Sequence, residues 1–121
     1  MNLTYPGALA LISEIADQLG AAKPTDPVVV VCPPFPFLSG VGEHLPKGGT
    51  VHLGAQNAHH KEGGAYTGEV EAKMLVSVGC EYVILGHSER RQHFREDDAL
   101  LGQKLKTVSY THLTLPTIYS V

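Results

Sequence analysis

The sequence lacks the features that would place it in several large classes of protein. No apolar stretch approaches the ~20 residues needed to span a bilayer, and no basic segment followed by an apolar one opens the chain, so we expect no membrane partner and no signal peptide. Nine Lys and Arg residues against twelve Asp and Glu residues give a net charge of −3, which leaves no basic surface for nucleic acid. The expected location is cytoplasmic.

Cysteine and metal-ligand patterns are equally sparse. The two cysteines, Cys32 and Cys80, have no CxxC spacing and sit at the edges of apolar runs, which is typical of small buried hydrophobes in a reduced protein. The pair His59-His60 has the residue type of a metal site, but adjacent side chains point in different directions and no carboxylate–His spacing accompanies them. We therefore expect a polar loop and no metal there. No GxGxxG follows a predicted strand, which argues against dinucleotide binding.

What the sequence does contain is a regular alternation of helical and strand patterns. Helices are predicted over 4–20 (with Thr4 and Gly20 as caps), 37–45, 69–78 (with Thr67 as a cap) and from Asp97 onward, and strands over 28–32, 51–55 and 82–85, with a polar loop at 21–26. Alternation with nearly continuous apolar strands predicts a parallel sheet covered on both faces. A doubly wound sheet and a (β/α)₈ barrel both fit this α/β pattern.

Titratable residues follow the strand predicted at 82–85. Gly86 is followed by His87, Ser88 and Glu89, and ligands bind outside the carboxyl ends of parallel strands. If a helical turn begins at Ser88, its N–H groups point back at the imidazole and favour the neutral ring. A neutral imidazole can polarise a carbonyl and move a proton between adjacent oxygens.

The charged residues around that histidine allow two interpretations. Glu89 could act as a base, although pairing with one of the neighbouring arginines is the favoured reading. Arg90 and Arg91 could clamp a phosphate. We instead favour an ion-pair scaffold in which the arginines meet the carboxylates of Glu96, Asp97 and Asp98.

The segment 56–69 is longer than the two to six residues of an ordinary connection between a strand and a helix. Gln56 and Asn57 at its start, and Thr67 and Glu69 at its end, can pin backbone groups. Its glycines lack the Lys-Ser/Thr of a P-loop. The segment is predicted to be an ordered loop that projects to meet a partner chain.

Taken together, several long motifs resemble the triosephosphate isomerase family over about residues 1–106. They are Cys32-Pro33-Pro34-Phe35, Gly54-Ala55-Gln56-Asn57, the run from Lys61 to Glu69, the run from Val83 to Arg91, and Gly102-Gln103-Lys104. The resemblance implies a partial (β/α)₈ TIM barrel with about three parallel strands and flanking helices. It also implies a homodimer that needs no cofactor and interconverts dihydroxyacetone phosphate and glyceraldehyde 3-phosphate through an enediol, in glycolysis and gluconeogenesis.

The resemblance also assigns roles to individual residues. His87 matches the family's electrophilic histidine, which is an established example of a catalytic neutral imidazole, and Glu89 matches the active-site glutamate beside it. Ser88 matches a serine that contacts the catalytic base, and Thr67 matches the tip of the interface loop. The supporting polar network is implied for Gln56, Asn57, Arg90 and Glu96.

Parts of the family pattern have no counterpart in this chain. The strand that carries the family's catalytic asparagine and lysine, the general-base glutamate, the closing lid and the phosphate-binding loops are missing, and a complete barrel takes ~250 residues. The chain alone is therefore expected to be inactive. Residues 107–121 contain no Lys, Arg, Asp, Glu or Gly and no helical periodicity, and we interpret them as an unrelated tail, a translated sequencing adaptor. The alternative function is a non-catalytic dimerising or binding fragment that uses loop 56–69.

Overall fold

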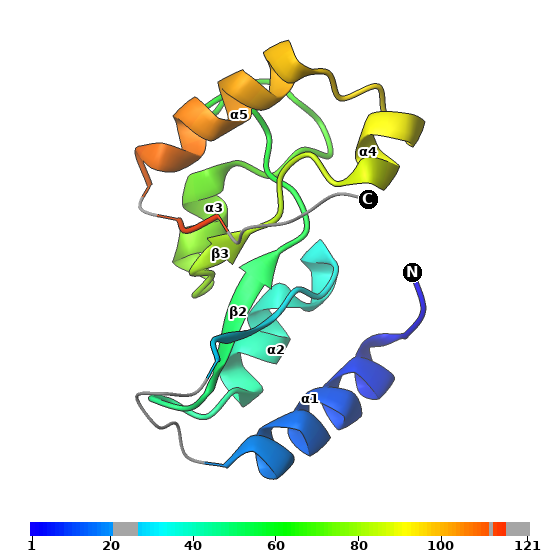
Figure 1. Cartoon of the computed structure of the whole chain (residues 1–121), viewed down its shortest axis with the longest axis vertical. Helices are drawn as coiled ribbons and strands as arrows, with labels where there is room; N and C mark the ends of the chain where they lie inside the picture. The colour runs from blue at the N-terminus through cyan, green and yellow to red at the C-terminus, as the bar shows by residue number, and fades with distance from the viewer. Residues whose placement is uncertain (21–26, 112, 116–121) are drawn as a thin grey trace.

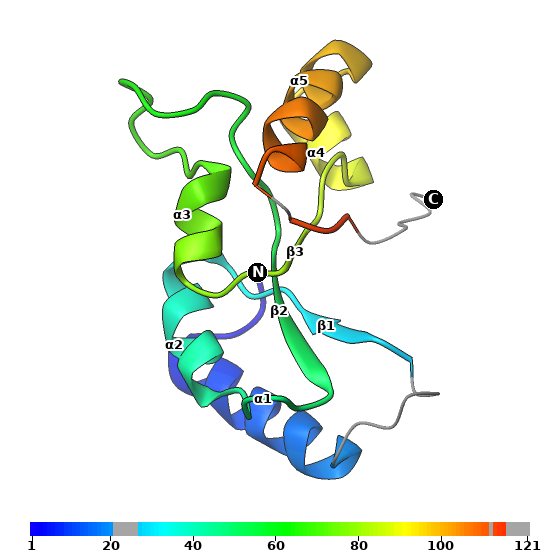
Figure 2. The ribbon, with the colours of Figure 1, turned by 90° about the vertical axis from the view of Figure 1, so that its left-hand side faces the viewer.

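The computed structural model describes residues 1–20, 27–111 and 113–115 and contains one parallel sheet. Its strands lie in the order β1 (Val29–Val31), β2 (Val51–Ala55) and β3 (Tyr82–Val83). Figure 1 labels β2 and β3, and Figure 2 labels all three. Val31 is in register with Leu53, and Gly54 with Tyr82. The parallel α/β arrangement predicted from the alternating pattern is confirmed.

Helices connect and flank the strands, and their bounds adjust those expected from the sequence. They are α1 (Tyr5–Leu19), the 3₁₀ turn η1 (Phe35–Phe37), α2 (Leu38–His44), α3 (Ala72–Ser77), α4 (Ser88–His93) and α5 (Asp98–Ser109). No helix in the described ranges is long and apolar enough to cross a membrane.

The hydrophobic core lies between β2 and the helices α2 and α3. Val51, Leu53 and Ala55 alternate along β2 and are all buried, as expected for one face of a strand. Leu53 and Ala55 join one cluster with the apolar residues of the two helices, which are Leu38, Val41, Ala72 and Leu75. This packing fixes the direction of β2, and with it the point where the long connection to α3 departs.

The two cysteines are free thiols, and their predicted burial is confirmed for Cys80 and only in part for Cys32. Cys80 is buried and belongs to the core cluster, whereas Cys32 is half-buried at the end of β1. Burial raises the pKa of the Cys80 thiol to about 11 and also raises the pKa of Cys32. Both side chains are therefore protonated at neutral pH and poor nucleophiles.

The capping roles predicted for Thr4 and Thr67 are wrong. Thr4 precedes α1 but makes no side-chain capping bond, although Gly20 does end the helix, with a φ of 61° and its N–H donated to Ala16 O. The helix predicted to begin at Glu69 begins instead at Ala72, after Glu71. The N–H groups of His59 and Glu69 close the loop onto Val70 O and Tyr66 O, so residues 66–70 are held outside the helix.

Several residues beyond 106 pack onto the fold, although the sequence predicts an unrelated tail there. α5 continues to Ser109, Val108 is only 1% exposed, and Leu113 is buried. Thr114 accepts from Val83 N at 3.1 Å and donates its own N–H to Glu81 O at 2.8 Å. The expectation of no helix is therefore wrong for 107–109. The predicted loop 21–26, residue 112 and residues 116–121 lie outside the described part of the chain.

Candidate functional site

The candidate site begins where β3 gives way to α4. Gly86 has a φ of 68°, in the left-handed region that glycine adopts without steric cost. This conformation turns the chain sharply, so that α4 starts at Ser88 with His87 as its N-cap residue. The helical turn predicted after the histidine is confirmed. Ser88 itself is half-buried in the first turn.

His87 is held by the backbone of that turn. The N–H of Glu89 donates to His87 Nδ1 at 3.2 Å. Because an accepting nitrogen carries no proton, this bond selects the neutral tautomer with its proton on Nε2. The side chain is 42% exposed, so Nε2–H is available to a carbonyl oxygen arriving from solvent.

Glu89 stands beside the imidazole and not beside an arginine. Its Oε2 lies 3.8 Å from His87 Nδ1, beyond hydrogen-bonding distance, and its side chain is 79% exposed. No ion pair between Glu89 and an arginine occurs in the described ranges, so the favoured sequence interpretation of Glu89 is wrong. The reason is geometric, because both arginines already bond to carboxylates that follow α4 in the chain, Glu96 and Asp98.

The arginines form the predicted scaffold. Arg90 Nε bonds to Glu96 Oε2 and its guanidinium lies 4.5 Å from the Phe94 ring centre. Arg91 Nη1 donates to Asp98 Oδ1 at 3.0 Å. Asp97, which was included in the same network, instead caps α5 by accepting from Leu100 N at 2.8 Å. These contacts tie α4 to the start of α5 and engage one nitrogen of each guanidinium.

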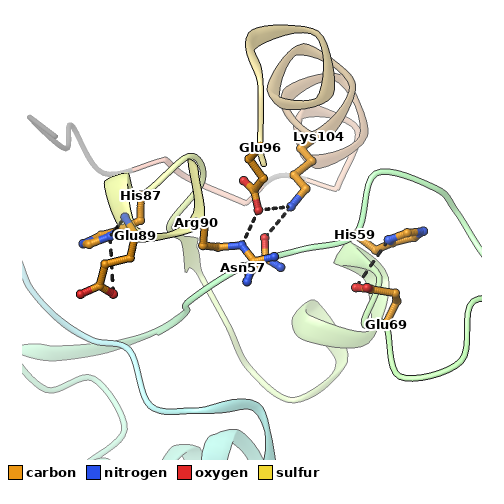
Figure 3. Close-up of polar contacts among 8 residues, drawn as sticks. All are labelled: Asn57, His59, Glu69, His87, Glu89, Arg90, Glu96 and Lys104. Carbon is orange, nitrogen blue, oxygen red and sulfur yellow. Dashed lines mark hydrogen bonds and ion pairs between the residues drawn. The ribbon is translucent and has the colours of Figure 1, made fainter. Parts of the chain in front are cut away.

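A buried polar network lies behind this scaffold (Figure 3). Lys104 Nζ donates to Glu96 Oε2 at 3.0 Å and to Asn57 Oδ1 at 2.7 Å. The three residues are 4%, 3% and 7% exposed respectively. Burial would raise the pKa of Glu96, but the hydrogen bonds and charges of Lys104 and Arg90 outweigh it and hold that pKa below its ordinary value. The network joins the start of the long loop to α5.

Lys104 is the residue that sequence reasoning missed. In the sequence it stands only within the motif Gly102-Gln103-Lys104, with no role assigned. Lysine is almost never buried unless it is paired, so an exposed position is the ordinary expectation. A signal was present, since Leu101, Lys104 and Val108 fall on one helical face, at spacings of three and four, and all three are buried. A charged residue on an apolar face, with a glutamate eight positions earlier, is the pattern that could have revealed it.

The loop 56–69 is ordered and projects from the end of β2, as Figure 2 shows. Gln56 Nε2 donates to Cys32 O at 2.8 Å, and Thr107 Oγ1 donates to His60 O at 2.8 Å. The start of the loop is therefore tied to β1 and to α5. Thr67, by contrast, is exposed, and the structure does not bring it into the His87 cluster.

His59 and His60 lie where the loop leaves the network. The ring of His59 stacks near His60 and Tyr66, at 4.5 and 4.6 Å between centroids, and its Nδ1 lies 3.5 Å from Glu69 Oε2. Burial lowers the pKa of His60, and the charges of His59, Lys61 and Lys104 lower it further against the opposing effect of Glu69. Within the described ranges, no three His, Cys, Asp or Glu side chains are grouped to hold a metal ion.

Three parallel strands flanked by helices, with a histidine at the carboxyl end of the last strand, are consistent with a segment of a (β/α)₈ barrel. Residues 1–118 match the family model described as triosephosphate isomerase. The chain therefore belongs to the triosephosphate isomerase family.

Similar curated proteins carry the same family name. The chain is 50% identical over 106 residues to a triosephosphate isomerase of Alkaliphilus oremlandii, covering 88% of this chain and 41% of the relative. It is 43% identical over 118 residues to one from Clostridium botulinum, covering 98% and 46%. A third, from Carboxydothermus hydrogenoformans, is 50% identical over 106 residues. The chain spans less than half the length of these relatives.

Proposed function

We propose that the complete protein interconverts dihydroxyacetone phosphate and glyceraldehyde 3-phosphate by proton transfer through an enediol. The observation that carries this proposal is the bond from Glu89 N–H to His87 Nδ1, at 3.2 Å. It leaves the proton of a neutral imidazole on Nε2, where it can polarise a substrate carbonyl and then pass between the two oxygens of the enediol. In the cell this reaction would serve glycolysis and gluconeogenesis in the cytoplasm.

Glu89 assists His87 in this proposal. Its backbone N–H donates to Nδ1 at 3.2 Å and so keeps the ring proton on Nε2, while its carboxylate lies 3.8 Å from Nδ1. Moving a proton between carbons also needs a base at carbon. In the described ranges, the only carboxylate within ion-pairing distance of His87 is Glu89, which this proposal uses to support the imidazole and not as the base at carbon. We therefore propose that this chain by itself has no isomerase activity.

The test uses this chain and a chimera. A coupled isomerase assay on residues 1–121 should give no turnover above background. A chimera in which residues 1–106 replace the matching segment of the Alkaliphilus relative should turn over the triose phosphate. A folded chimera without activity, beside an active parent, would contradict the proposal. Turnover by residues 1–121 alone would contradict the proposed inactivity of the isolated chain.

We further propose that loop 56–69 mediates homodimer formation. Its base is tied to β1 and α5 through Gln56 and Thr107, while Thr67 and Tyr66 remain exposed. The alternative, a non-catalytic binding fragment, rests on the same exposed residues. Size-exclusion chromatography of Thr67→Glu against Thr67→Ser tests both proposals. If the loop forms a dimer interface, the glutamate buries a charge there and should dissociate the dimer, whereas the serine should not. A monomeric wild type, with no change in Thr67→Glu, would rule out association through the loop.

We propose a domain over 1–106 and an unrelated tail over 107–121, on the composition of the tail alone. Resequencing the gene on both sides of codon 106 tests it. The proposal fails if genomic DNA encodes 107–121 in continuous frame with the preceding residues.

A further inference from the structure

A leucine on α5 packs directly against the turn that presents His87. A Cβ atom placed on Gly86 would lie 2.8 Å from Leu101 Cδ1 and 2.9 Å from Leu101 Cδ2, well inside van der Waals contact. The side chain of Leu101 therefore covers the outer side of Gly86, and it is itself only 8% exposed. The turn cannot move outward without displacing this leucine.

The helix that carries Leu101 is itself fixed to α4. Arg91 Nη1 reaches Asp98 Oδ1 at 3.0 Å, and Arg90 and Lys104 both bond to Glu96. Asp97 caps the same end of α5 through Leu100 N. These contacts link α4 to α5 and oppose a movement of α5 away from Gly86.

The conformation of Gly86 decides where the imidazole points. With a φ of 68° at Gly86, His87 emerges as the N-cap residue, and its Nδ1 meets the N–H of Glu89. At 3.2 Å this single bond is long for a hydrogen bond, and the side chain is 42% exposed. A bond of this kind on an exposed ring persists only if the backbone beneath it stays in place.

We propose that Leu101 is a positioning residue for His87, which acts by holding Gly86 in the turn that keeps Nδ1 on the Glu89 N–H. The link to catalysis rests on the proposed function, but the positioning itself is a property of this chain. Leu101 touches no reacting group and acts only through Gly86. In a solvent-exposed turn without this support, the ring would sample both neutral tautomers and several rotamers.

The experiment reads the tautomer of His87 directly in this chain. Long-range ¹H–¹⁵N spectra of the imidazoles are recorded at about pH 8, above the ordinary range of histidine titration. In the wild type, Nδ1 of His87 should resonate as an unprotonated acceptor and Nε2 as a protonated nitrogen. In Leu101→Ala the two shifts should move toward those of His93, which is exposed.

Matched variants separate positioning from loss of stability. Val108→Ala removes buried apolar atoms from the same helix. The nearest neighbours of a Cβ placed on Gly86 are all atoms of Leu101, so this variant should leave the His87 shifts unchanged. Leu101→Met keeps the volume and should restore them. If Leu101→Ala does not fold, Leu101→Val supplies a smaller loss of the same contact and should give a smaller shift in the same direction.

Two results would overturn the inference. One is a His87 spectrum that is identical in the wild type and in the folded Leu101→Ala or Leu101→Val chain. The other is an equal shift in Val108→Ala. Neither result depends on isomerase activity, so this inference and the proposed function can fail separately.

Discussion

Replacing Lys104 by methionine should destabilise the fold far more than its place in a charged helix suggests. The substitution removes the donor to Glu96 Oε2 and to Asn57 Oδ1, which lie 3.0 and 2.7 Å from Nζ. Glu96 is 3% exposed, and among the described residues its Oε1 already has no hydrogen-bond partner. The variant therefore leaves a buried carboxylate with Arg90 as its remaining described partner.

The size of the effect follows from these contacts. Breaking a buried ion pair by removing one partner costs about 3–5 kcal/mol, and leaving the amide oxygen of Asn57 without its donor costs about 1–3 kcal/mol. Arg90 still neutralises Glu96 in part, and methionine fills much of the lysine volume. We expect a net loss of about 3 kcal/mol, which is a large part of the ~5–15 kcal/mol that holds a domain of ordinary stability together.

Urea denaturation followed by circular dichroism measures this loss, and Lys106→Met is the matched control. Lys106 lies on the same helix but is exposed, so its replacement should change the free energy of unfolding by less than about 0.5 kcal/mol. The double variant Lys104→Met with Glu96→Gln should cost less than the sum of the two single variants, since both disrupt one network. Equal losses for Lys104→Met and Lys106→Met, or strict additivity in the cycle, would refute the reasoning.

Three further predictions concern acid stability and backbone conformation. Because the folded pKa of Glu96 lies below its ordinary value of 4.5, the stability it contributes is complete above that pH and is lost as the pH falls below it. The urea midpoint should thus drop more between about pH 5.5 and 3.5 in the wild type than in Glu96→Gln, and parallel curves would disprove this. Arg95 has a φ of 54°, so Arg95→Gly should raise the free energy of unfolding by about 0.5–1 kcal/mol while Arg95→Ala gives no such gain. Gly54→Ala should destabilise by about 1–3 kcal/mol, because its Cβ would lie 2.8 Å from Cys32 Sγ and 2.9 Å from Val30 Cγ1, whereas Gly102→Ala meets nothing within 4 Å and should be neutral or stabilising by thermal melting.

The alternating apolar pattern predicted the strands because burial on both faces leaves a direct record in composition. β2 was located to the residue, Val51–Ala55, and the parallel order followed from the helices between strands. The start of α3 was not predictable in the same way. It depends on hydrogen bonds that fold the loop onto itself, such as His59 N–H to Val70 O, and these join residues whose side chains carry no periodic signal.

The site shows a similar division. His87 could be found because it follows a strand and a glycine, and the turn geometry that orients it is local. The partners of the charged residues were harder to assign, since Glu89, Arg90 and Arg91 each had several candidates within a few residues. Lys104 and Asn57 are 47 positions apart in sequence, so only the three-dimensional packing of α5 over the loop could reveal their contact.

The central claim is that His87 supplies the proton at oxygen in an isomerase of this family. The most direct measurement is kcat for the chimera with residues 1–106 of this chain, compared between the wild type and His87→Gln. A positioned acid or base contributes about 10²–10⁴-fold, so kcat should fall by at least about a hundredfold while the chimera stays folded. An unchanged kcat in a folded His87→Gln chimera would contradict the account.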